Sequence, residues 1–131
     1  MSRTYVANGN VSPMRFVKSA GTTLDNKVIQ CTGSDRPLGV SKQGTRNAGG
    51  LASDDGFAAI AGEDLHVHTV GDECLIQLGG TVVAGDMLKP HTDGTALAGS
   101  STDVCGAQAI DSGVSGEFIW CKVIGAGVPM A

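Results

Sequence analysis

The chain is a succession of short apolar runs separated by turn residues. Within most runs apolar and polar side chains alternate, which is typical of half-buried β-strands. Such runs occupy residues 14–18, 27–32, 38–41, 65–70, 74–78, 81–84, 87–89, 104–110 and 117–124. Gly-Asp and Gly-Gly pairs lie between several of the runs and favour tight reversals. The pattern predicts an all-β fold, a small β-barrel or β-sandwich with short strands and long loops.

The spacing of glycine argues against helices. The chain has 20 glycines in 131 residues, and its longest glycine-free stretches, Asn10–Ala20 and Thr22–Thr32, have only 11 residues each. An interior glycine costs a helix about 1 kcal/mol relative to alanine. No tandem repeat is evident in the sequence. The glycine-rich segment 42–56 is predicted to be a long exposed loop that contacts a neighbouring subunit.

The two ends of the chain are predicted to lie outside the β domain. Residues 1–12 contain a turn cluster and precede the first convincing strand, so they are interpreted as an extended N-terminal arm. Residues 13–125 are predicted to form a single β domain, and residues 126–131 a short tail. Tyr5 and Val6 are candidate partner-binding residues, because an arm can dock in a groove while its backbone pairs with a sheet edge.

The last predicted strand is apolar on both faces. Phe118 and Trp120 share one face, whereas Ile119, Cys121 and Val123 share the other. A strand of this kind is either buried on both sides or uses one side as an interface. Phe118 and Trp120 are therefore candidate partner-binding residues, and a buried surface of this kind favours an oligomer.

Charge and hydropathy disfavour two classes of partner. The net charge is −4, the sequence pI is about 5.1, and no basic stripe is present to bind the phosphates of a nucleic acid. No apolar run approaches the length of a membrane span. The N-terminus lacks the apolar stretch of a signal peptide, so we expect synthesis and use in a cytoplasm.

The four cysteines are interpreted as small core residues. Cys31, Cys74, Cys105 and Cys121 lie in apolar runs, and none of them forms the C-x-x-C pair of a structural zinc site. If residues 104–110 and 117–123 form a hairpin, Cys105 and Cys121 could be near cross-strand neighbours. A cytoplasmic origin still favours free thiols.

Two histidines provide the sharpest local candidate for metal chemistry. His66 and His68 would point to one face of a strand and could form half of a zinc or copper site. A third ligand would have to come from Glu63, Asp64 or His91. A polar strand face is the preferred interpretation, so no metal and no cofactor are expected. A small-molecule- or metal-binding β-barrel that uses His66 and His68 is the alternative function.

The sequence contains no recognisable catalytic motif. The sequence contains neither the G-x-S-x-G of a nucleophile elbow nor a phosphate-binding glycine loop, and most aspartates stand beside glycines, where they make turns. We therefore expect no enzymatic activity. The turns Gly71-Asp72 and Gly85-Asp86 are similar to the paired turns of biotinyl and lipoyl carrier domains, but no lysine stands in the context that those domains modify.

Seven segments carry a further signal by their order and spacing. They are residues 12–18, 28–32, 36–41, 62–67, 79–88, 93–96 and 107–110. Together they resemble the capsid decoration (cement) proteins of tailed bacteriophages, over roughly residues 12–124. The resemblance implies a β-tulip-like fold and a virion structural protein, synthesised in the host cytoplasm and placed on the outer capsid surface. It also implies a homotrimer that bridges major capsid protein subunits and stabilises the shell.

Overall fold

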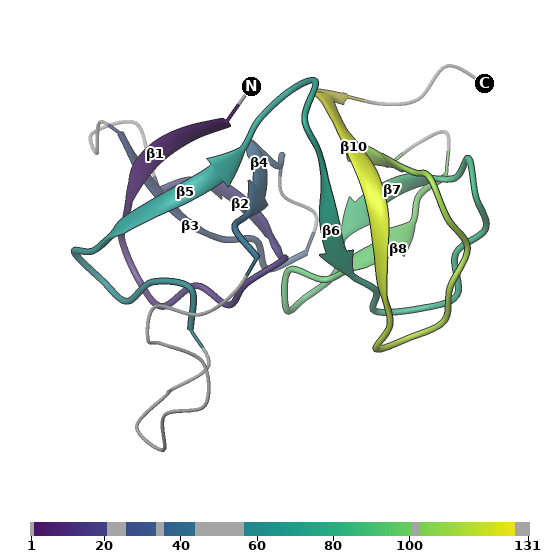
Figure 1. Ribbon diagram of the computed structural model, residues 1–131, viewed down its shortest axis with the longest axis horizontal. Helices are drawn as coiled ribbons and strands as arrows, with labels where there is room; N and C mark the ends of the chain where they lie inside the picture. The colour runs from purple at the N-terminus through teal and green to yellow at the C-terminus, as the bar shows by residue number, and fades with distance from the viewer. Residues whose placement is uncertain (1, 21–25, 34–35, 44–56, 101–102, 128–131) are drawn as a thin grey trace.

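The computed structural model describes residues 2–20, 26–33, 36–43, 57–100 and 103–127. These residues form ten β-strands and no helix, arranged in two five-stranded units that lie side by side (Figure 1). The predicted all-β class is confirmed. The predicted loop at 42–56 lies almost entirely outside the described residues.

The first unit is a closed barrel. Its strands are β1 (Ser2–Ala7), β2 (Phe16–Ser19), β3 (Lys27–Gln30), β4 (Gly39–Ser41) and β5 (Asp64–His68). Their order is β1-β3-β2-β4-β5, and β5 pairs back onto β1 to close the barrel. The β1–β3 pair is parallel, and the other pairs are antiparallel.

The N-terminal segment is part of this barrel, and the prediction that residues 1–12 form an arm is wrong. Tyr5 lies opposite Leu65 of β5, and the pairing of β1 with β5 extends over the whole of Ser2–Val6. Ala7 and Val11 are fully buried. The sequence Tyr5-Val6-Ala7 is a short β-forming run, and its partners on β3 and β5 are too distant in the sequence for the pattern to reveal the pairing.

The second unit is a five-stranded antiparallel sheet. Its strands are β6 (Glu73–Gln77), β7 (Met87–Pro90), β8 (Ala96–Ala98), β9 (Cys105–Ala109) and β10 (Phe118–Gly127), in the order β6-β10-β9-β7-β8. The predicted hairpin appears as β9 and β10. However, Cys105 lies opposite Gly127, and Cys121 lies between Ala109 and Cys74, so Cys105 and Cys121 are not cross-strand neighbours.

The two units have the same topology. Read from β1, the barrel order is β1-β5-β4-β2-β3, and the second sheet repeats it as β6-β10-β9-β7-β8. In this order β3, the last strand of the barrel, pairs in parallel with β1. At the corresponding place the second unit has a parallel bridge between Leu78 and Ala96. Each strand of the first unit thus has an equivalent in the second, five strands further along the chain.

The backbone hydrogen bonds follow the same duplication. The Ala7 N–H donates to the Glu63 carbonyl, and at the equivalent place the Leu78 N–H donates to the Glu117 carbonyl, both at 2.8 Å. The turn before β2 contains Met14 at φ 56°, and the turn before β7 contains Gly85 at φ 94°. The absence of a repeat in the sequence therefore does not extend to the structure, which contains two copies of one five-stranded motif.

One hydrophobic cluster joins the two copies. Phe16, Cys31 and Val40 come from the barrel, yet they pack in the same cluster as the buried side chains of the second sheet. A second cluster, which includes Val17 and Leu65, belongs to the barrel alone. The two copies are therefore packed through a shared core rather than linked only by the chain.

Polar contacts reinforce the junction between the copies. Arg15 Nη2 donates to Gln77 Oε1 at 2.7 Å, and its Nη1 donates to the Asp93 carbonyl at 2.8 Å. Gln30 Nε2 donates to the same carbonyl at 2.6 Å. Because Arg15 and Gln30 come from the first copy and Gln77 and Asp93 from the second, these bonds fix the orientation of one copy against the other.

Candidate interaction surface

Strand β10 presents aromatic side chains to solvent. Phe118 is 50% exposed and Trp120 is 48% exposed, whereas Ile119 between them is only 4% exposed. The alternation matches the two predicted faces of this strand, with Cys121 and Val123 buried on the inner side. Exposed aromatic side chains of this size are typical of binding surfaces.

Neighbouring strands extend this apolar surface. Trp120 lies opposite Leu75 of β6, and on its other side the Ile110 N–H donates to the Trp120 carbonyl at 3.0 Å. Leu75 is half-buried and Ile110 is exposed. We call Phe118, Trp120, Leu75 and Ile110 the aromatic face. The sequence pattern does not reveal Leu75 and Ile110 as part of this surface, because only the register of β6, β9 and β10 places them beside Trp120.

The turn before β10 positions the aromatic face. The Val114 N–H donates to Glu117 Oε1 at 2.8 Å, and the Glu117 N–H donates to the Val114 carbonyl at 3.1 Å. Gly116 has φ 89°, the left-handed region that glycine enters without a Cβ clash. The turn therefore fixes where β10 begins, and so which residues of the strand face outward.

The first copy provides an internal comparison for this surface. Strand β5 is the equivalent of β10, and its turn is built the same way, with Gly62 at φ 89° and the Ile60 N–H donating to Glu63 Oε1. At the positions equivalent to Phe118 and Trp120, β5 carries Asp64 and His66. The shared fold therefore does not require aromatic residues at these positions, and the aromatic face is particular to the second copy.

Tyr5 and Val6 are placed differently from what an arm would require. Both lie in β1, where Tyr5 packs partly buried against the barrel core and Val6 pairs with Asp64. They are not close to β10 in the sheet order. Neither is free to reach a distant partner while the barrel stays closed.

His66 and His68 share a strand face, as their spacing indicates. Their ring centroids are 5.8 Å apart with the rings perpendicular, and His68 Nδ1 is 3.7 Å from Asp72 Oδ2. Burial lowers the pKa of His68, although the Asp72 carboxylate opposes the shift. The described residues include no group of three or more His, Cys, Asp or Glu side chains arranged to hold a metal ion.

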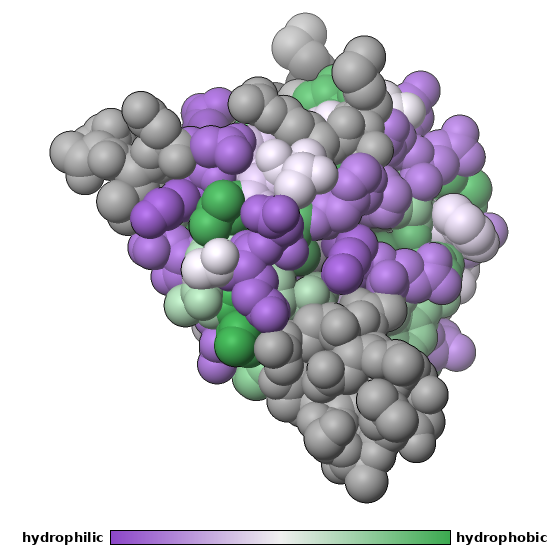
Figure 2. Space-filling view, turned by 60° about the vertical axis from the view of Figure 1, so that its left-hand side comes forward, coloured by the Kyte–Doolittle hydropathy of each residue, from purple (hydrophilic) through white to green (hydrophobic). Residues whose placement is uncertain are grey.

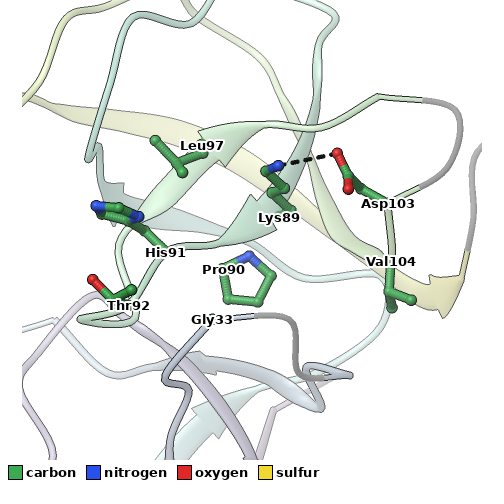
Figure 3. A pocket seen from close by; sticks show the side chains of 8 residues that line it. All are labelled: Gly33, Lys89, Pro90, His91, Thr92, Leu97, Asp103 and Val104. Carbon is green, nitrogen blue, oxygen red and sulfur yellow. Dashed lines mark hydrogen bonds and ion pairs between the residues drawn. The ribbon is translucent and has the colours of Figure 1, made fainter.

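His91, one of the three possible third ligands, lies elsewhere and lines a cavity of about 390 Å³ beside β7 and β8 (Figure 3). Lys89 Nζ and Asp103 Oδ2, which also line it, are 3.1 Å apart. The backbone N–H of Ser100 and the Lys89 ammonium hold the pKa of Asp103 below its usual range. The two side chains thus form an ion pair in the wall of the cavity.

The rest of the described surface is mixed. Figure 2 shows one side of the molecule, on which hydrophilic side chains cover most of the described area and hydrophobic ones form smaller groups. Among the described residues there is no helix with the length and apolar character that crossing a bilayer requires.

Comparison with known proteins finds similarity among solved structures. A search of protein families found no match, and neither did a search of curated protein sequences. Among solved structures, the chain is similar to the N base of the head fiber gp8.5 of bacteriophage phi29, with a TM-score of 0.67 and 16% sequence identity. The match covers 99% of this chain and 98% of that one. The two proteins share a fold over their whole length.

Proposed function

We propose that this chain is a bacteriophage virion structural protein, and specifically a capsid decoration (cement) protein. In this proposal it binds the outer capsid surface as a homotrimer and stabilises the shell by bridging major capsid protein subunits. It does so without enzymatic activity, a cofactor or a metal. Two lines of support come from the fold shared with a phage head fiber base and from the resemblance to decoration proteins.

The observation that carries the binding role is the aromatic face. A half-exposed Trp120 flanked by Phe118 and Ile110 offers the kind of side chains that dominate binding energy at protein interfaces. We assign this face to the contact with the major capsid protein. A modest affinity at each contact suffices, because many copies bind one closed shell and a trimer binds it through several contacts at once.

The proposal is tested by mixing the purified protein with undecorated capsids of the phage that encodes it. Sedimentation should show the protein bound to the particles, and a cryo-EM reconstruction should show it as trimers on the outside, at three-fold positions. A protein that stays unbound at saturating concentration, or that occupies the tail or the capsid interior, would contradict the proposal.

A further inference from the structure

Two buried thiols face each other across strands β6 and β10. Cys74 and Cys121 are directly opposed in the antiparallel register, and their Sγ atoms are 3.8 Å apart. Directly opposed residues in such a pair have Cα atoms about 4.5–5.5 Å apart, which lies inside the range found in disulfides. The sulfur atoms would have to approach to about 2.0 Å, a movement that rotation of the two side chains can supply.

We propose that Cys74 and Cys121 form an intramolecular disulfide when the folded protein enters an oxidising medium. All four cysteines are free thiols in this structure. The bond would cross-link β6, an edge strand of the second sheet, to β10, which carries Phe118 and Trp120 of the aromatic face. This inference does not depend on the proposed function.

The duplication shows that the thiol pair is not a requirement of the fold. The equivalent cross-strand pair in the first copy is Arg3 and Val67. In that copy, β1 also pairs with β3, so it is held on both sides. In the second copy, the same place has only the bridge between Leu78 and Ala96. A covalent link between β6 and β10 would therefore strengthen the copy with the weaker closure.

The thiols are protected from rapid oxidation in the closed fold. The contact with Cys74 and burial both raise the pKa of the Cys121 thiol, so the reactive thiolate is scarce. Cys74, on the edge strand, is slightly more accessible than Cys121. Local opening of β6 would expose it, and reaction there is expected to be slow rather than absent.

The reaction requires a disulfide oxidant of low molecular weight. The Cys74 thiolate attacks one sulfur of the oxidant and forms a mixed disulfide, which releases one small thiol. The Cys121 thiolate then attacks the Cys74 sulfur, which forms the protein disulfide and releases the second small thiol. Two electrons pass to the oxidant, and the two protons from the protein thiols end on the released thiols.

The test uses the native full-length chain and hydroxyethyl disulfide as the oxidant, in urea too dilute to change the circular dichroism spectrum. After unfolding and alkylation, two of the four cysteines should be modified, and the unalkylated chain should be lighter by about 2 Da. Peptide mapping should find Cys74 linked to Cys121. Four alkylated cysteines after prolonged incubation, or a bond to Cys31 or Cys105, would overturn the proposal.

Two double variants and a melting curve complete the test. C31A/C105A should still lose about 2 Da, whereas C74A/C121A should not. The bond closes a loop of 47 residues, so the oxidised wild type should melt roughly 7–15 °C higher than the reduced form, and reduction should reverse the shift. A lower melting temperature after oxidation would show that the bond strains the sheet and would refute a stabilising role for it. Wild-type peptide mapping decides the pairing if a variant does not fold.

Discussion

Replacement of Phe16 by alanine should destabilise both copies of the motif at once. Phe16 belongs to β2 of the barrel, is fully buried, and packs in the cluster formed with the second sheet. Truncation of a buried phenylalanine costs about 3–5 kcal/mol. With a guanidinium m value of about 4 kcal/mol/M, the unfolding midpoint should fall by roughly 1 M. The loss of about 3–5 kcal/mol is a large part of the free energy of unfolding of a typical folded domain, which is about 5–15 kcal/mol.

Two spectroscopic probes can follow this loss in separate parts of the molecule. Trp120 is the only tryptophan and lies on β10, so its fluorescence reports unfolding of the second copy. Far-UV circular dichroism reports the strands of both copies. Because the core is shared, the two probes should give coincident transitions in wild type, and both midpoints should fall together in Phe16→Ala.

Val17→Ala is the matched control for the Phe16 substitution. Val17 is the next residue on β2 and is equally buried, but it packs in the cluster that belongs to the barrel alone. Its truncation should cost about 2 kcal/mol, less than that of Phe16. If Phe16→Ala left the fluorescence midpoint unchanged while circular dichroism showed an earlier transition, the copies would unfold independently and the shared core would carry no coupling.

Three further predictions concern the barrel, a turn and a histidine. Deletion of residues 2–12 should abolish the cooperative thermal transition, because it removes β1 and opens the barrel; an unchanged melting curve would show that β1 is dispensable. Gly116→Ala should lower the free energy of unfolding in urea by about 1–2 kcal/mol through backbone strain alone, since Gly116 has φ 89° and no atom lies near the added Cβ. Gly9→Ala should have little effect, and equal losses for the two variants would contradict this. The pKa of His68 is lower in the folded state, so the fold favours the neutral imidazole. The stability that neutral His68 contributes should be complete above the unfolded-state pKa of about 6.5 and should decline as pH falls below it. Urea midpoints at pH 7.5 and 5 should therefore differ less in His68→Asn than in wild type, and an unchanged difference would refute this role.

The alternation of side chains predicted most strands and the faces of the strand that matters most. In β10 the pattern separated the exposed Phe118 and Trp120 from the buried Ile119, because a strand cannot place adjacent residues on the same face. Turn chemistry was equally informative, and Gly85-Asp86 does separate two segments as predicted. However, residues 81–84 form only an isolated bridge at Val82 rather than a strand.

The sequence pattern does not predict β1 and β8, for two different physical reasons. Strand β1 is a short run with a weak local pattern, and its partners β3 and β5 are distant in the sequence. Strand β8 pairs with its sequence neighbour β7, but its three residues are all apolar and show no alternation. The alternation predicts no strand between residues 90 and 103, yet Ala96–Ala98 pair with β7. Intrinsic preference is a weak guide where packing against neighbouring strands decides the structure.

The duplication could not be found from residue identity. Only a few equivalent positions carry the same residue: Gly9 and Gly80, Val11 and Val82, Lys18 and Lys89, Gly62 and Gly116, and Glu63 and Glu117. Residues 42–63 connect β4 to β5, but only residues 110–117 connect β9 to β10, so the two copies also differ in length. The shared features are turns and registers, which the sequence specifies through many different residues.

The most direct test of the central claim compares equivalent surfaces of the two copies for capsid binding. The double variant Phe118→Ser/Trp120→Ser removes the aromatic face, and Asp64→Ser/His66→Ser changes the equivalent positions of β5 as a matched control. Both pairs are at the surface, so both variants should stay folded. Co-sedimentation with undecorated capsids should show at least a tenfold weaker affinity for the first variant and wild-type affinity for the second. Full affinity of the folded Phe118→Ser/Trp120→Ser variant would contradict the account.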